Sequence, residues 1–164
     1  MENKNDKQIE PIDFAELVKM CPEQPFRVNG NNGRLVKAIK QMQCERIVAQ
    51  GLLPIIPLVR DDFKEVRKLP TKFDFVEASA ETFDECMEKL QSKHEATIQK
   101  FAHAIFHIVA SEKVLFEPSD IKDFTEFIER NFPKTNYIYG VTRDPFDEVG
   151  FKIQALVYNI KPTE

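Results

Sequence analysis

The sequence predicts a single-domain α+β protein with a small, mostly antiparallel sheet packed on one long amphipathic helix and several shorter helices. Three observations predict this class. The 164 residues suffice for one domain with a hydrophobic core. Apolar residues at helical spacing run through the middle of the chain, over about residues 79–112. Extended patterns then follow at 136–142 and 150–160, where β-branched and aromatic residues indicate strands.

The composition is that of an ordinary globular protein. Hydrophobic residues make up 42% and charged residues 30%, which excludes a disordered chain. Fourteen Phe and no Trp predict a core of aromatic rings that need no hydrogen-bond partner. The three cysteines are far apart and form no CxxC pair, which favours free thiols.

The location and the domain limits follow from the same composition. No apolar run reaches the roughly 18 residues that cross a bilayer, so we expect no membrane contact. Residues 1–10 are polar, carry no apolar signal region and are expected to form an N-terminal arm before a domain at 11–164. The expected location is the cytoplasm, or the host cytoplasm or virion if the protein is viral.

The first half of the chain predicts short elements. We expect a helix capped by Asp13 and ending at Met20, a helix over about 34–50, an extended segment over 52–60, a short helix over 61–69 and a strand over 72–77. Gly51 is placed to stop the second helix. Because Pro54 and Pro57 donate no backbone hydrogen bond, the extended segment is an edge strand at best.

The long helix is the clearest pattern in the sequence. Thr82 and Glu85 have the spacing of a capping box. The apolar stripe that follows consists of Phe83, Met87, Leu90, His94, Ile98, Phe101, Ile105 and Ile108. A further helix is expected at Ser119–Asn131, with Ser119 as its N-cap and Pro133 beyond its end.

All three histidines lie within this predicted helix. His103 and His107 have the i, i+4 spacing at which two imidazoles on one helix face share a metal ion. They point away from the apolar stripe, so they are either a metal pair, an exposed pair or a contact to another chain. His94 falls inside the stripe and is expected to be a hydrogen-bonded core histidine.

Charge is unevenly distributed along the chain. Residues 27–72 carry ten Lys and Arg against four Asp and Glu, whereas residues 73–164 carry ten against 17. The basic block either mixes with acidic residues on the folded surface or forms a face for nucleic acid or an acidic partner. Its candidate contacts are Arg34, Lys37, Lys40 and Arg46.

Residues 27–58 carry one family resemblance. Leu35, Ile39 and the run Gly51–Ile56 resemble the opening of ParB-type partition domains. The Gly-x-His-Arg-type motif with which those domains contact nucleotide is absent, so the resemblance implies no nucleotide chemistry here.

These patterns leave three functional hypotheses. The first is a non-catalytic interaction or structural component of a larger assembly, such as a small subunit of a virus neck or tail, with other protein subunits as partners in a homo- or hetero-oligomer. The second is a nucleic-acid-associated protein that uses the basic 27–72 segment. The third is a metal-dependent enzyme built on His103 and His107. No set of residues suggests a catalytic centre, and no cofactor is expected.

Overall fold

The described residues form an α+β protein, as the sequence predicts. The computed structural model describes residues 32–68, 70–146 and 150–160; the predicted arm at 1–10 and the predicted helix from Asp13 to Met20 lie outside them. In this part the elements are α3 (Asn32–Met42), α4 (Cys44–Ala49), β1 (Leu53–Ile56), η2 (Arg60–Phe63), α5 (Lys64–Lys68), β2 (Pro70–Ala80), α6 (Phe83–Gln99), β3 (His103–Ser111), α7 (Pro118–Asn131), β4 (Asn136–Asp144) and β5 (Phe151–Ile160).

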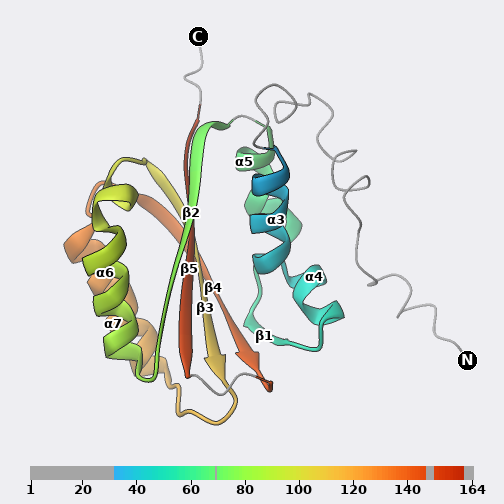
Figure 1. Cartoon of the computed structure of the whole chain (residues 1–164), viewed down its shortest axis with the longest axis vertical. Helices are drawn as coiled ribbons and strands as arrows, with labels where there is room; N and C mark the ends of the chain where they lie inside the picture. Colours follow the sequence, from blue (N-terminus) through green and yellow to red (C-terminus); the bar gives the residue numbers. More distant parts are fainter. Residues whose placement is uncertain (1–31, 69, 147–149, 161–164) are drawn as a thin grey trace, which may run out of the picture.

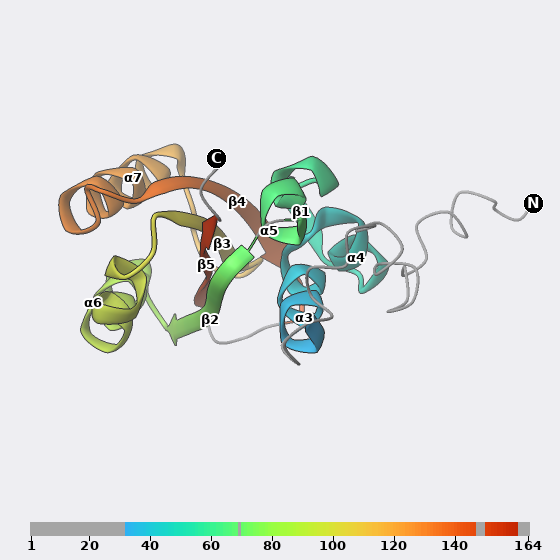
Figure 2. The ribbon, with the colours of Figure 1, turned by 90° about the horizontal axis from the view of Figure 1, so that it is seen from above.

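The five described strands make one sheet in the order β1-β4-β3-β5-β2. The β3–β4 pair is parallel, because α7 carries the chain from β3 across to β4, and the other three pairs are antiparallel. The prediction of a mostly antiparallel sheet is therefore confirmed. Figures 1 and 2 show three layers, with α6 and α7 on one face of the sheet and α3, α4 and α5 on the other.

The predicted single helix over 79–112 is wrong in its second half. Helix α6 spans 17 residues and ends at Gln99, and the chain enters the sheet as β3 at His103. Strand β3 lies between β4 and β5 and is covered on both faces, so residues 104–110 are all buried. A run that is apolar at every position also satisfies the helical spacing, and periodicity alone cannot separate the two structures.

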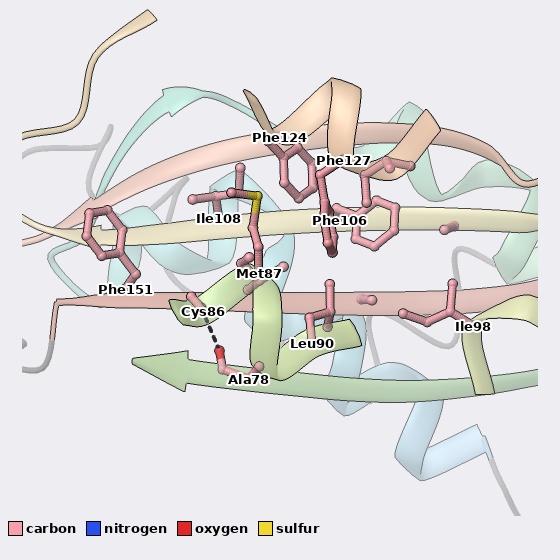
Figure 3. Packing of buried hydrophobic residues seen from close by; sticks show 14 of the residues in the cluster. Ala78, Cys86, Met87, Leu90, Ile98, Phe106, Ile108, Phe124, Phe127 and Phe151 are labelled. Atoms are coloured by element: carbon pink, nitrogen blue, oxygen red, sulfur yellow. Dashed lines mark hydrogen bonds between the residues drawn. The ribbon is translucent and has the colours of Figure 1, made fainter. Parts of the chain in front are cut away.

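The first half of that prediction is confirmed. Helix α6 begins after Thr82, whose Oγ1 accepts a hydrogen bond from the backbone N–H of Glu85 at 3.2 Å. Its apolar side packs on the sheet: Figure 3 shows Met87 and Leu90 on one side of Phe106 of β3, with Phe124 of α7 on the other. The Phe-rich core packs edge to face, as in the Phe106–Phe124 pair with centroids 5.5 Å apart.

The other elements follow their predicted positions with local differences. The helix expected at 34–50 is two helices, because Gln43 is extended and the N–H of Cys44 bonds to the carbonyl of Leu58 at 2.7 Å. Gly51 has φ +89° and ends α4, as predicted. Helix α7 begins one residue early at Pro118, so the predicted Ser119 N-cap is wrong.

Two predictions about the first and the last strand are confirmed. Strand β1 is an edge strand, as its prolines require. Strand β5 is buried on both faces, which its apolar residues at successive positions predict.

The sheet face under α3 and α5 holds a second, smaller core. Its buried apolar residues are Leu35, Ala38, Ile39, Met42, Leu58, Phe63, Val66, Ile105, Leu156 and Tyr158. Leu58 lies on Gly140 of β4, where a Cβ would stand 2.5 Å from the Leu58 Cγ. This close approach fixes the segment between β1 and η2 on the sheet.

Candidate functional site

The four predicted basic residues do not form one surface. Arg34 and Lys37 are exposed on α3 and Lys40 is half-buried there, at spacings of three residues that keep them on one side of the helix. We call these three residues the basic ridge. Arg46 lies on α4 and is buried, so it belongs to the packing of that helix and not to the ridge.

The basic ridge lies at the β2 edge of the sheet. The guanidinium of Arg34 reaches the carboxylate of Asp74 on β2 at 3.2 Å. It also stacks over the ring of Phe73, 5.2 Å from its centroid. Both contacts are with the outermost strand on that side, so Arg34 lies over the β2 edge.

The two histidines proposed as a metal pair lie on β3, not on a helix. They point to the same face of the sheet, but four residues of strand separate them by about 13 Å. His103 is half-buried and stacks on Tyr158, with centroids 5.1 Å apart, whereas His107 is only 1% exposed. The i, i+4 geometry of the metal hypothesis is therefore absent. Within the described ranges no group of three or more His, Cys, Asp and Glu is arranged to hold a metal ion.

His107 belongs to a row of polar side chains that crosses four strands. Its Nδ1 lies 2.8 Å from the Gln154 Oε1 and its Nε2 lies 2.7 Å from the Thr142 Oγ1. The Gln154 amide nitrogen donates to Gln41 at 3.0 Å and to Glu77 at 3.3 Å. The Gln154 oxygen therefore accepts from the Nδ1–H of His107, and the Nε2 accepts from the Thr142 hydroxyl.

This arrangement uses a neutral imidazole. Burial of His107 lowers its pKa from 6.5 to about 4; the hydrogen bond that His107 donates to Gln154 opposes this shift and the charge of Lys152 adds to it. Both ring nitrogens already have partners, and the row joins α3 to the sheet through Gln41. The row is a structural network that holds the α3 layer in register with the strands.

The prediction for His94 holds for its hydrogen bond, whereas the side chain is not in the core. It lies on α6, is half-buried, and its Nε2 is 3.1 Å from the carbonyl oxygen of Glu77.

A groove of about 420 Å³ opens between η2–α5 and the first half of β4. We call it the acidic groove, because Asp61, Asp62 and Glu65 line one wall. Ile138 and the stacked rings of His103 and Tyr158 line the opposite wall.

A hydrogen bond crosses this groove, and the short pairing of β1 leaves it open. Burial raises the pKa of Tyr158 to about 12. The negative charge of Glu65 and the hydrogen bond between the Tyr158 hydroxyl and the Glu65 carboxylate raise the pKa further. The Tyr158 hydroxyl is therefore a donor to that carboxylate at neutral pH. Strand β1 pairs only with residues 141–143 of β4, so the first half of β4 lies beyond β1 and leaves the groove open.

Several exposed large apolar side chains belong to segments at the other end of the sheet. Leu53 and Ile55 of β1 are 46% and 58% exposed, and Leu115 and Phe146 are 75% and 71% exposed. We call these four residues the apolar end surface. They are four of the six large apolar side chains that are exposed in the described residues. Sequence reasoning missed this surface, because its members lie in three separate segments.

Arg143 contacts two of the segments that carry these side chains. It pairs with Leu53 across the β1–β4 ladder. Its guanidinium donates to the carbonyl oxygens of Ser111 at 2.6 Å and Val114 at 2.8 Å, which holds the segment that leads into Leu115. Phe146 is anchored on the other side, since its ring would stand 3.1 Å from a Cβ on Gly51.

Comparison with known proteins shows a fold likeness only. No protein family matches the sequence, and no curated protein matches it. Among solved structures, an FtsZ dimer from M. jannaschii is similar with a TM-score of 0.55 and 13% identity, over 87% of this chain and 42% of that chain. An FtsZ point mutant from M. jannaschii has a TM-score of 0.47 and 15% identity, over 88% of this chain and 44% of its own. The chain thus spans less than half the length of these FtsZ chains.

No helix among the described residues is both long and apolar enough to cross a membrane.

Proposed function

We propose that this protein is a non-catalytic interaction component of a larger assembly and that it binds a protein partner through the apolar end surface. The observation that carries the proposal is that four exposed large apolar side chains, those of Leu53, Ile55, Leu115 and Phe146, lie in segments at one end of the sheet. Arg143 contacts the segments of Leu53 and Leu115. Large apolar side chains exposed at one end of a sheet are available to a protein partner that removes them from water.

The exposure of these side chains sets the energy available to a partner. Burying a Leu or Phe side chain completely contributes about 1.5–3 kcal/mol. Leu115 and Phe146 are each about three-quarters exposed, so most of that free energy is unused in the isolated chain.

The surface is also held in place before binding. Two hydrogen bonds from Arg143 fix the backbone before Leu115, and the β1–β4 ladder fixes Leu53. An interface built on ordered backbone loses little conformational entropy on association, which favours a specific contact.

The test is a double substitution, Leu115→Ser with Phe146→Ser, in the full chain. We expect the complex formed by the wild-type chain to weaken by about 100-fold or more, because two large contacts are lost. Val59→Thr is the matched control, since Val59 is exposed outside this surface. Unfolding curves establish that all three proteins are equally folded. Association that is unchanged by the double substitution would contradict the proposal.

A second candidate function is nucleic-acid binding by the basic ridge. The observation that favours it is the alignment of Arg34, Lys37 and Lys40 on one side of α3, a helix with no acidic residue. Fluorescence anisotropy with a labelled duplex tests it: affinity should fall steeply with salt, and each Ala substitution should reduce the slope of log K against log salt by about 1. Binding that is indifferent to salt would exclude this function.

A further inference from the structure

The basic ridge and the acidic groove are built from different residues on neighbouring strands. The ridge is tied to β2 through the Arg34–Asp74 ion pair. The groove is lined by Ile138 of β4 and Tyr158 of β5, and Tyr158 pairs across the sheet with Phe73, over which Arg34 stacks. The two surfaces lie side by side and share no residue.

The ridge presents unbalanced positive charge. Arg34 is partly neutralised by Asp74, whereas Lys37 and Lys40 extend from the next turns of α3 with no acidic residue on that helix. Lysines on a helix surface with apolar stems and charged ends suit a partner that offers an apolar wall beside carboxylates.

The acidic groove offers that combination. Its carboxylates outnumber its one lysine, Lys64, by three to one. Ile138 is 40% exposed in it, and the ring of Tyr158 adjoins. Carboxylates repel phosphate, so the groove chemistry selects a cationic protein surface and not a nucleic acid.

The carboxylates differ in their internal roles. The Asp62 carboxylate accepts from the backbone N–H of Val59 at 2.7 Å, and Glu65 accepts from the hydroxyl of Tyr158. Asp61 is exposed. Asp61 is therefore the position at which the groove charge can be changed without disturbing either of these two contacts.

We propose that the acidic groove receives the basic ridge of a second copy of this chain. The charges are complementary, and the apolar groove wall accommodates the lysine stems. Because the two surfaces are different, the contact is head-to-tail, and each added copy again exposes one free ridge and one free groove. This inference rests on the proposed function, since it names a second copy as one partner in the assembly.

Sedimentation velocity over a concentration series tests the contact. We expect a series of oligomers that grows with concentration at about 0.1 M NaCl and shrinks at about 1 M, as the Debye length falls from about 10 to about 3 Å. A series that stops at the dimer would contradict the head-to-tail geometry.

A charge swap then identifies the two surfaces. Lys37→Glu alone and Asp61→Lys alone should each weaken self-association about tenfold or more, because like charges meet at every contact. An equal mixture of the two single variants should associate again, since every mixed contact pairs opposite charges. The matched controls are Lys93→Glu on α6 and Asp123→Lys on α7, which make the same charge changes on the far face and should leave association unchanged.

The outcomes separate this inference from the proposed function. If the single variants associate like the wild type, or if the mixture does not recover, the ridge–groove contact is wrong. The same holds if Lys37→Glu abolishes duplex binding and leaves self-association intact. In those cases a complex that still depends on Leu115 and Phe146 leaves the proposed function standing. A chain that forms no complex of any kind overturns both.

Discussion

Acid should destabilise this protein through His107. The imidazole is neutral in the folded state, with a pKa of about 4, whereas the unfolded chain has the ordinary value of 6.5. Between these two values the unfolded state binds more protons, so the free energy of unfolding rises with pH across this window. The stabilisation is fully present above about pH 6.5 and is lost as the pH falls toward about 4.

The magnitude follows from the size of the shift. A difference of about 2.5 pKa units corresponds to about 3 kcal/mol at about 1.36 kcal/mol per unit. About 2 kcal/mol of this is lost by pH 5. The cost arises chiefly because the charged imidazolium would be buried away from water.

Urea unfolding of the wild type and of His107→Gln at pH 5 and pH 7 measures the effect. The variant should lose about 2 kcal/mol less than the wild type between these pH values. His103→Gln is the matched control, since it removes a half-buried imidazole from the same face of β3, and it should keep the wild-type difference.

Equal slopes in the wild type and in His107→Gln would refute the reasoning. If His107→Gln does not fold, a titration of the His107 ring by NMR in the wild-type protein gives the answer directly. A midpoint near 6.5 would refute the account equally.

Two further predictions concern packing and thiol chemistry. Gly140→Ala should lower the free energy of unfolding by about 1–3 kcal/mol, because its Cβ would meet the Leu58 Cγ at 2.5 Å and the Ile56 carbonyl oxygen at 2.8 Å. Gly33→Ala is the control and should not destabilise the protein, because no atom lies within 4 Å of the new Cβ. Urea midpoints that rank the two variants the other way would contradict this packing. Iodoacetamide should modify Cys44 well before Cys86 in the folded protein, because burial raises the pKa of the Cys86 thiol to about 12 and the thiol bonds to the Ala78 carbonyl at 3.3 Å. Peptide mass spectrometry measures both rates; they should converge in urea, and equal rates without urea would contradict the packing.

The sequence predicts those elements whose signals are local. Thr82 caps α6 because its hydroxyl and the following backbone lie within one turn, and Gly51 ends α4 because the chain needs a positive φ there. The edge position of β1 follows from its prolines. Each of these properties depends on neighbours in the chain.

Elements that depend on distant neighbours are the ones the sequence misplaces. Residues 103–111 form a strand because β4 and β5 flank them, and neither strand is visible from that segment alone. Gln43 breaks a helix that its own sequence would continue, because Cys44 bonds to Leu58. In an evenly apolar run such as residues 103–111, helical periodicity does not separate a helix from a buried strand.

The polar row has a signal in the sequence. His107 and Gln154 are isolated polar residues inside apolar runs, which indicates buried groups that must be paired. The pairing itself, across β3 and β5, needs the register of the strands. The apolar end surface and the acidic groove had no comparable signal, because residues far apart in the chain meet there.

The central claim is that this chain works in an assembly through its exposed apolar end surface. Size exclusion with light scattering, on protein purified from its natural source with every co-eluting chain identified, tests it most directly. We predict a mass above the 19.1 kDa of one chain, in a complex that the Leu115→Ser and Phe146→Ser double substitution dissociates. A mass of 19.1 kDa at every concentration, with no co-eluting chain, would contradict the account.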